Sequence, residues 1–271
     1  MTPPEIEGML KEMVAPLNDD HVEIELTESY SPHLGPPEWW VAGKARDYVK
    51  LIEDKYVQLS YSSDRLIRHG SLTDDTGYIL LAGMGGVLNQ AQAAEIARRQ
   101  FSAAITDFSE KKNLVIDLRF NRGGYDVVGL EFASFFTNEY RTAYHREVMN
   151  GGDFVPIQSV YVQPGEQFFN GEVYLLTSGA TVSAAETFIL AMQSVTTPIV
   201  IGEQTAGFFS DSLPRRLPNG VEFSLSHVRY YDLEGTLREG VPVIPDHYLP
   251  MGSFEKDSHL ERALEIIGSQ D

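Results

Sequence analysis

The 271-residue chain contains no cysteine. Disulfide bonds, thiolate metal sites and a cysteine nucleophile are therefore excluded. No run of apolar residues approaches the roughly 18 that a membrane-spanning helix needs, so we expect no membrane span. Basic residues are scarce: 21 Lys and Arg stand against 39 Asp and Glu, giving a formal net charge of −18. This charge argues against nucleic acid or anionic lipid as a partner of the bulk surface.

The sequence also lacks the short patterns typical of metal sites and of export. It has no H-E-x-x-H motif and no other tight cluster of His, Asp and Glu, so we expect neither a metal nor a cofactor. The first residues, MTPPEIEGMLKEM, have no basic segment followed by an apolar core, so no signal peptide is expected in them. Neither the compartment nor the oligomeric state is indicated by these patterns.

The chain does have a regular alternation of strand-like and helix-like segments. Strands are predicted at 21–26, 77–84 and 173–176 and from residue 113, helices at 4–14, 46–57 and 89–112 and from about Ser183, and a proline-rich loop at 31–40. Strand, helix and strand follow one another repeatedly. This order favours βαβ units in a layered α/β fold.

The most informative segment is TSGATVSAAETFILAMQ, at residues 177–193. A buried strand, a turn of small residues and a helix beginning near Ser183 would expose the serine hydroxyl beside the free N–H groups of the helix. That arrangement suits a nucleophile whose intermediate carries an oxyanion. The alternative is an ordinary helix cap, in which Glu186 completes a capping box.

A second segment, NLVIDLRFNRGGYD at residues 113–126, places two glycines directly after a buried strand. Glycine allows positive φ and lets backbone N–H groups approach a ligand closely. The alternative is a tight turn that needs glycine for its shape alone. We expect one oxyanion donor from Gly123 or Gly124 and the other from Ala184.

These two segments and three others make the sequence similar to the S41 peptidases, which are tail-specific or C-terminal processing proteases. The matching pieces, in the family's order, are Ile116–Gly124, Thr181–Glu186, Ile201–Gly207, Leu217–Gly220 and Gly235–Asp246. The resemblance implies an α/β fold with a ClpP/crotonase-like spiral core at 76–271 and a small N-terminal subdomain at 1–75. The stretch between His21 and Gly77 is too short for the PDZ module of many relatives, which needs about 80 to 100 residues.

The resemblance also bears on the general base. Processing proteases carry a lysine soon after the serine, but Phe208 stands at the matching position, and no lysine occurs from Asn113 to Glu255. The tricorn-like branch of the family uses a histidine from an N-terminal segment instead. LNDDHVEIEL resembles that pattern and implies that His21 is the base. His227 is the rival, although its place in an alternating strand favours a packed histidine.

For the third catalytic role, the resemblance points to Glu239 in LREGVPVIPD, where a carboxylate would orient the imidazole. Asp20 and Asp246 are the competing carboxylates. Asp117 and Arg119 alternate on a buried strand and are expected to form a structural pair. Arg215 and Arg216 are expected to be solvated surface charges.

The predicted function is that of a serine peptidase acting on a peptide or protein through Ser183, His21 and Glu239, with Gly123, Gly124 and Ala184 as oxyanion donors. One alternative is an inactive relative that binds an apolar ligand or peptide on the same scaffold. Another is a crotonase-type enzyme acting on acyl thioesters, which also uses a glycine-rich oxyanion loop but needs no serine in this motif.

Overall fold

The computed structural model describes residues 3–26, 28–32, 35–41, 43–62, 66–85, 89–252 and 255–269. The helices are α1 (Pro3–Val14), η1 (Ala15–Leu17), α2 (Glu38–Val41), α3 (Ala45–Lys55), α4 (Gln90–Asp107), α5 (Asp126–Ala133), η2 (Ser134–Phe136), α6 (Ala184–Val195) and α7 (Ser258–Gly268). The strands are β1 (Glu23–Ile24), β2 (Ser60–Tyr61), β3 (Ile67–Ser71), β4 (Thr76–Leu81), β5 (Asn113–Asp117), β6 (Arg141–Asn150), β7 (Asp153–Phe154), β8 (Gln158–Val162), β9 (Glu172–Thr177), β10 (Ile199–Gly202), β11 (Ser212–Arg216), β12 (Glu222–Ser226), β13 (Val228–Tyr231) and β14 (His247–Tyr248).

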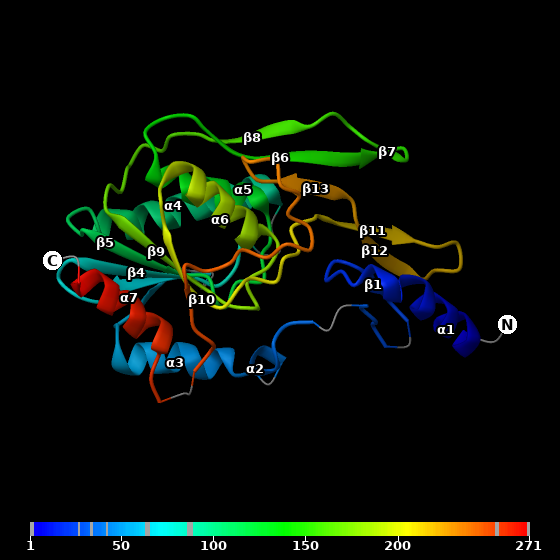
Figure 1. Ribbon diagram of the computed structural model, residues 1–271, viewed down its shortest axis with the longest axis horizontal. Coiled ribbons are helices and arrows are strands. Elements are labelled where there is room, and N and C mark those ends of the chain that lie inside the picture. Colours follow the sequence, from blue (N-terminus) through cyan, green and yellow to red (C-terminus); the bar gives the residue numbers. More distant parts are fainter. Residues whose placement is uncertain are drawn as a thin grey trace.

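The centre of the molecule is a seven-stranded sheet in the order β14-β10-β9-β5-β4-β3-β2 (Figure 1). The strands from β4 to β14 in this order are parallel, and β3 and β2 are antiparallel to their neighbours. Helix α4 connects β4 to β5, and α6 connects β9 to β10. The predicted βαβ units and layered α/β fold are therefore confirmed.

Helices cover both faces of this sheet (Figure 1). On one face α4, α5 and α6 enclose the larger apolar cluster, which includes Phe101, Phe132 and Phe188. On the other face α3 and α7 pack over a second cluster. Leu175 belongs to the first cluster and its neighbour Leu176 to the second, because successive side chains of a strand point to opposite faces. Burial on both faces explains the continuous apolar runs in the sequence.

Two smaller sheets extend beyond the central one (Figure 1). One contains β13, β6, β7 and β8, and the other is the three-stranded sheet β1-β12-β11. The alternating pattern at 221–231 predicts a single strand, but the structure breaks it at His227 into β12 and β13, which join different sheets. The break occurs where the N–H groups of His227 and Val228 both donate to the Ser210 hydroxyl.

The N-terminal segment adds the short strand β1 to the hairpin formed by β11 and β12. β1 pairs with β12, and Val14, Val22 and Ile24 form a small apolar cluster with Phe223 packed against it. β1 covers only two residues of the predicted strand 21–26. A turn precedes it, in which the N–H of His21 donates a hydrogen bond to the Asp19 carboxylate. His21 therefore lies at the edge of this hairpin.

The other predicted elements lie close to the observed ones. The helix predicted at 89–112 ends at Asp107 and is capped by the Asn89 side chain. The predicted loop at 31–40 contains the short helix α2, while His33 and Leu34 lie outside the described residues. The boundary predicted between an N-terminal subdomain at 1–75 and a catalytic domain at 76–271 stays a prediction. β2 and β3 precede this boundary but belong to the central sheet. No helix in the described ranges has the length and apolar character to cross a membrane.

Candidate active site

Ser183 lies at a turn between β9 and α6, immediately before the first helical residue. Its backbone has φ 63° and ψ −128°. Among the described residues, Asn18 is the other non-glycine residue with positive φ. Such conformations cost of the order of 1–3 kcal/mol and persist where the surroundings impose them. The surroundings here include the Phe208 carbonyl, which accepts the Ser183 N–H at 3.0 Å.

Glu186 fixes this turn from one helical turn further on. Its buried carboxylate accepts hydrogen bonds from the Ser183 N–H at 3.2 Å, from the Gly207 and Phe208 N–H groups at 2.8 and 3.0 Å, and from the Thr205 hydroxyl at 2.5 Å. Burial raises the pKa of Glu186 to about 7, and these donors oppose that rise. Glu186 thus joins the Ser183 turn to the segment at 205–208.

The glycine pair of the second segment lies directly against Ser183. Gly123 has φ 87°, and a Cβ atom there would be 2.7 Å from the Ser183 Cβ. Gly124 has φ 141°, and a Cβ atom there would be 2.2 Å from the Met84 carbonyl oxygen. Both close approaches and both positive φ values require glycine.

The backbone N–H groups around this turn differ in whether they already have a hydrogen-bond acceptor. The N–H of Gly123 donates to the buried Asn121 side chain at 2.9 Å. In the described part of the chain, no acceptor is recorded for the N–H of Gly124 or of Ala184. Of the three expected oxyanion donors, Gly124 and Ala184 are therefore the two whose N–H groups are available.

His21 lies beside two carboxylates. One atom each from Asp19, His21 and Glu239 lies within 4.8 Å of the others. The His21 Nδ1 atom is buried, 3.7 Å from the Asp19 carboxylate, and makes no hydrogen bond with the described residues. Burial lowers the pKa of His21, and Asp19 and Asp20 act in the opposite direction. The fold thus brings together residues from the two ends of the sequence.

Glu239 is held in place by two backbone donors. Its Oε2 atom accepts the N–H groups of Phe209 and Ser210 at 3.0 and 2.8 Å. Its Oε1 atom is buried without a partner among the described residues. Burial raises the pKa of Glu239 to about 7, and the charge of Asp19 adds to this effect. A buried carboxylate oxygen close to His21 can accept a hydrogen bond from the imidazole.

The competing carboxylates have other partners. Asp20 forms an ion pair with Arg122 at 2.7 Å, and Asp246 accepts the Val200 N–H at 2.8 Å. The rival base, His227, places its Nδ1 atom 2.9 Å from the Asp211 carbonyl oxygen. This contact leaves His227 oriented by a backbone group, whereas His21 has carboxylate neighbours.

A cavity of about 570 Å³ opens between these groups. Its lining includes Ser183, Gly124, His21 and His227. Six charged or hydroxyl-bearing residues that the sequence patterns did not indicate also line it, namely Tyr125, Asp126, Tyr144, Arg146, Asp211 and Ser212. The position of Asp126, two residues after the glycine pair and at the start of α5, is the one signal that could have indicated it.

No lysine belongs to the cavity lining that the structure describes. Phe208, at the position of the family's lysine, is buried and contacts the serine turn through its backbone. Lys44 and Lys50 lie on the surface and pair with aspartates of α3. Arg119 forms the expected buried pair with Asp117, at 2.6 Å, and pairs in addition with Asp257, the residue that caps the start of α7. The charges of Arg215 and Arg216 are exposed as expected.

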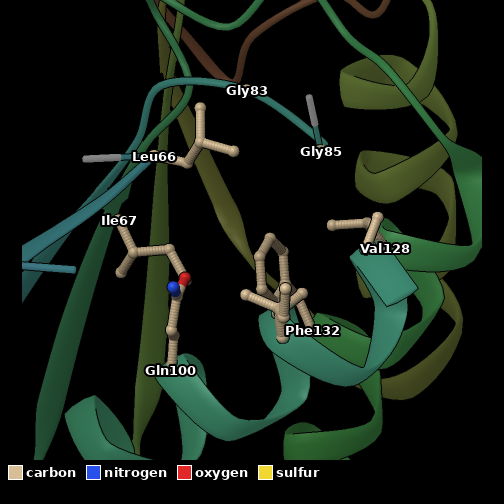
Figure 2. Close-up of a pocket in the computed structure, with 10 residues that line it drawn as sticks. Leu66, Ile67, Gly83, Gly85, Gln100, Val128 and Phe132 are labelled. Carbon is tan, nitrogen blue, oxygen red and sulfur yellow. The ribbon is translucent and has the colours of Figure 1, made fainter. Parts of the chain in front are cut away.

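Figure 2 shows a second pocket, lined by apolar groups such as Leu66, Ile67, Val128 and Phe132 together with Gln100. Its volume is about 30 Å³, which is room for roughly one or two water molecules. Among the residues that the structure describes, no serine or charged group lines it. The larger cavity is therefore the candidate active site.

The sequence is similar to those of known peptidases. Residues 75–249 match the profile of Peptidase family S41. A carboxyl-terminal-processing protease of Picosynechococcus is 29% identical over 161 residues, covering 56% of this chain and 37% of the relative, so this chain spans well under half the length of that protein.

Solved structures show the same fold. A candidate peptidase from Parabacteroides merdae superposes with a TM-score of 0.78 at 21% identity, over 98% of this chain and 84% of the other. The tricorn protease gives a TM-score of 0.51 at 19% identity, over 72% of this chain and 18% of its own. The fold is thus the mixed α/β fold of S41 peptidase structures. Because the family profile matches more than half of this chain, the chain belongs to peptidase family S41.

Proposed function

We propose that this protein is a serine peptidase in which Ser183 is the nucleophile, His21 the general base and Glu239 the residue that orients His21. The observation that carries the proposal is that Ser183, His21 and Gly124 line one cavity, while Glu239 lies against His21. Residues separated widely in sequence contribute a hydroxyl, an imidazole and an oxyanion donor to the same space. These are the components of a serine hydrolase.

In this mechanism the Ser183 hydroxyl oxygen attacks the carbonyl carbon of a peptide bond, and His21 takes the hydroxyl proton. The N–H groups of Gly124 and Ala184 stabilise the oxyanion of the tetrahedral intermediate. His21 then gives the proton to the leaving amine, which breaks the C–N bond and leaves an ester on Ser183. Water then attacks the ester while His21 takes its proton, and His21 returns that proton to the Ser183 oxygen as the C–O bond breaks and the acid product leaves. Asp19 and Glu239 stabilise the protonated imidazole in between.

The proposal assigns the chain to the tricorn-like branch, with a histidine base and no catalytic lysine. Phe208 at the lysine position and the absence of lysine from the described cavity lining support this assignment. The peptide or protein substrate is part of the same proposal. The charged lining of the cavity disfavours the alternative of an apolar-ligand module, and the apolar pocket of Figure 2 is too small for such a ligand.

The test is labelling with a phosphonate that reacts with serine nucleophiles, followed by mapping of the modified peptide. We expect modification of Ser183, and the loss of labelling in His21→Gln. Two matched variants are controls: His227→Gln tests the rival base and Lys50→Met a surface lysine, and both should retain labelling. Labelling elsewhere, or labelling that survives His21→Gln and is lost in His227→Gln, would overturn the assignments. Binding of coenzyme A without any labelling would favour the crotonase-type alternative.

A further inference from the structure

The cavity beside Ser183 contains charged groups that the proposed reaction does not use. Asp126 is the first residue of α5, and its carboxylate accepts the Thr187 hydroxyl at 2.9 Å. Thr187 lies on α6, four residues after Ser183 at the N-cap, so it is on the same face and about 6 Å further along the helix axis. The carboxylate of Asp126 therefore lies about one helical turn beyond the nucleophile.

A second carboxylate, that of Asp211, faces the same cavity and shares a partner with Asp126. The Tyr230 hydroxyl lies 2.5 Å from the Asp126 carboxylate and 3.0 Å from the Asp211 carboxylate. A phenol has one proton and can donate to one of these oxygens at a time. The other carboxylate is left without that donor. The pKa of Asp126 rises to about 6 because of burial, with the charge of Asp211 as the next cause.

The positive charge in the cavity is smaller than the negative charge. Arg146 on β6 lines the cavity and interacts with Asp126 and with Tyr230. Within the described ranges, Arg146 forms no ion pair at 4 Å or less with either aspartate, and its buried Nε atom has no hydrogen-bond partner. Burial lowers the pKa of His21 and so disfavours its charged form. Two carboxylates thus stand against one guanidinium beside the nucleophile.

We propose that this cavity is a subsite for a positively charged side chain, carried by the substrate residue whose carbonyl Ser183 attacks, with Asp126 at its base and Asp211 on its wall. The inference rests on the proposed function of Ser183. A lysine has a four-carbon stem, which can span one helical turn, and an ammonium with three donors. Leu130 and Val160 line the cavity and can contact the stem. A glutamate side chain would instead add a third carboxylate to the existing pair.

The experiment uses three peptide phosphonates that differ only at the residue next to phosphorus: lysine, its neutral analogue norleucine, and glutamate. We expect Ser183 to react at least about tenfold faster with the lysine probe than with norleucine, because only lysine can form charge-assisted hydrogen bonds with the aspartates. A factor of ten corresponds to about 1.4 kcal/mol. Glutamate should be slowest.

The variants Asp126→Asn and Asp211→Asn should each lower the ratio of lysine to norleucine rates towards one. Asp211 comes from a different segment of the chain and provides a test that does not depend on Asp126. Asp153→Asn, an exposed residue of β7, should leave the ratio unchanged. Equal rates for lysine and norleucine in the wild-type protein, or an unchanged ratio in both cavity variants, would overturn the subsite. Failure of every probe to label Ser183 would instead count against the proposed function.

Discussion

An ion pair links the segment that carries the candidate base to the loop that carries the oxyanion donors. Asp20 precedes His21, Arg122 precedes Gly123, and their side chains meet at 2.7 Å. The exposed fractions are 12% for Asp20 and 31% for Arg122, so solvent screens the pair only in part. β1 covers just two residues, and this pair adds to the hydrogen bonds that position His21.

Removal of either partner should reduce peptide hydrolysis. An exposed ion pair contributes at most about 1 kcal/mol, and a charge-assisted hydrogen bond about 1.5–3 kcal/mol. For this partly buried pair we expect a coupling of about 1–2 kcal/mol, which corresponds to roughly 5-fold to 30-fold in kcat/KM. The measurement is a double-mutant cycle with Arg122→Met and Asp20→Asn. The exposed pair of Arg216 and Glu222 is the control and should give less than about 0.5 kcal/mol.

The pH profile gives a sharper readout, because the two charges act on His21 in opposite directions. Asp20 raises the pKa of the imidazole and Arg122 lowers it. Activity needs the neutral imidazole and therefore rises with pH through that pKa. Asp20→Asn should shift the acid limb to lower pH, Arg122→Met should shift it to higher pH, and the double variant should lie between them. Shifts in the same direction, or a coupling near zero, would refute this reasoning.

Four further predictions concern the site and the fold around it. Ser183→Ala should abolish peptide hydrolysis, by about 10⁴-fold or more, with an unchanged circular dichroism spectrum; turnover near the wild-type rate would remove the nucleophile. His21→Gln should be as damaging in the same assay, and the wild-type rate should rise to a plateau with a midpoint below about pH 6.5, because burial lowers the pKa of His21; a rate that keeps climbing in alkali would indicate another base. Gly124→Ala should lower turnover by roughly 10² and also reduce the urea midpoint, because the new Cβ would lie 2.2 Å from the Met84 carbonyl oxygen; a rate loss that only follows the loss of folded protein would favour the simple turn. Arg119→Met should cost about 3–5 kcal/mol in urea denaturation, because two buried carboxylates lose their partner; a cost below about 1 kcal/mol would contradict this.

Local sequence patterns were sufficient to predict the central fold. The apolar runs at β4, β5 and β9 and the helical spacing of α4 depend on neighbouring residues only, and so does the cap that begins α6. The positive φ of Gly123 and Gly124 could be expected for the same reason, since a glycine pair after a buried strand marks such a turn. The predicted alternation at 221–231 was wrong at His227, where a tertiary hydrogen bond from Ser210 interrupts the strand.

The cavity, by contrast, was decided by tertiary structure. Asp126, Arg146 and Asp211 meet there because α5, β6 and the segment before β11 converge, and no spacing in the sequence records that convergence. The approach of Glu239 to His21 depends on β1 pairing with β12, a contact between the two ends of the chain. The sequence by itself thus determined which segments form helices and strands and which residue types could react. Only the packing of distant segments decided which charges share the cavity, because electrostatic interaction depends on distance in space.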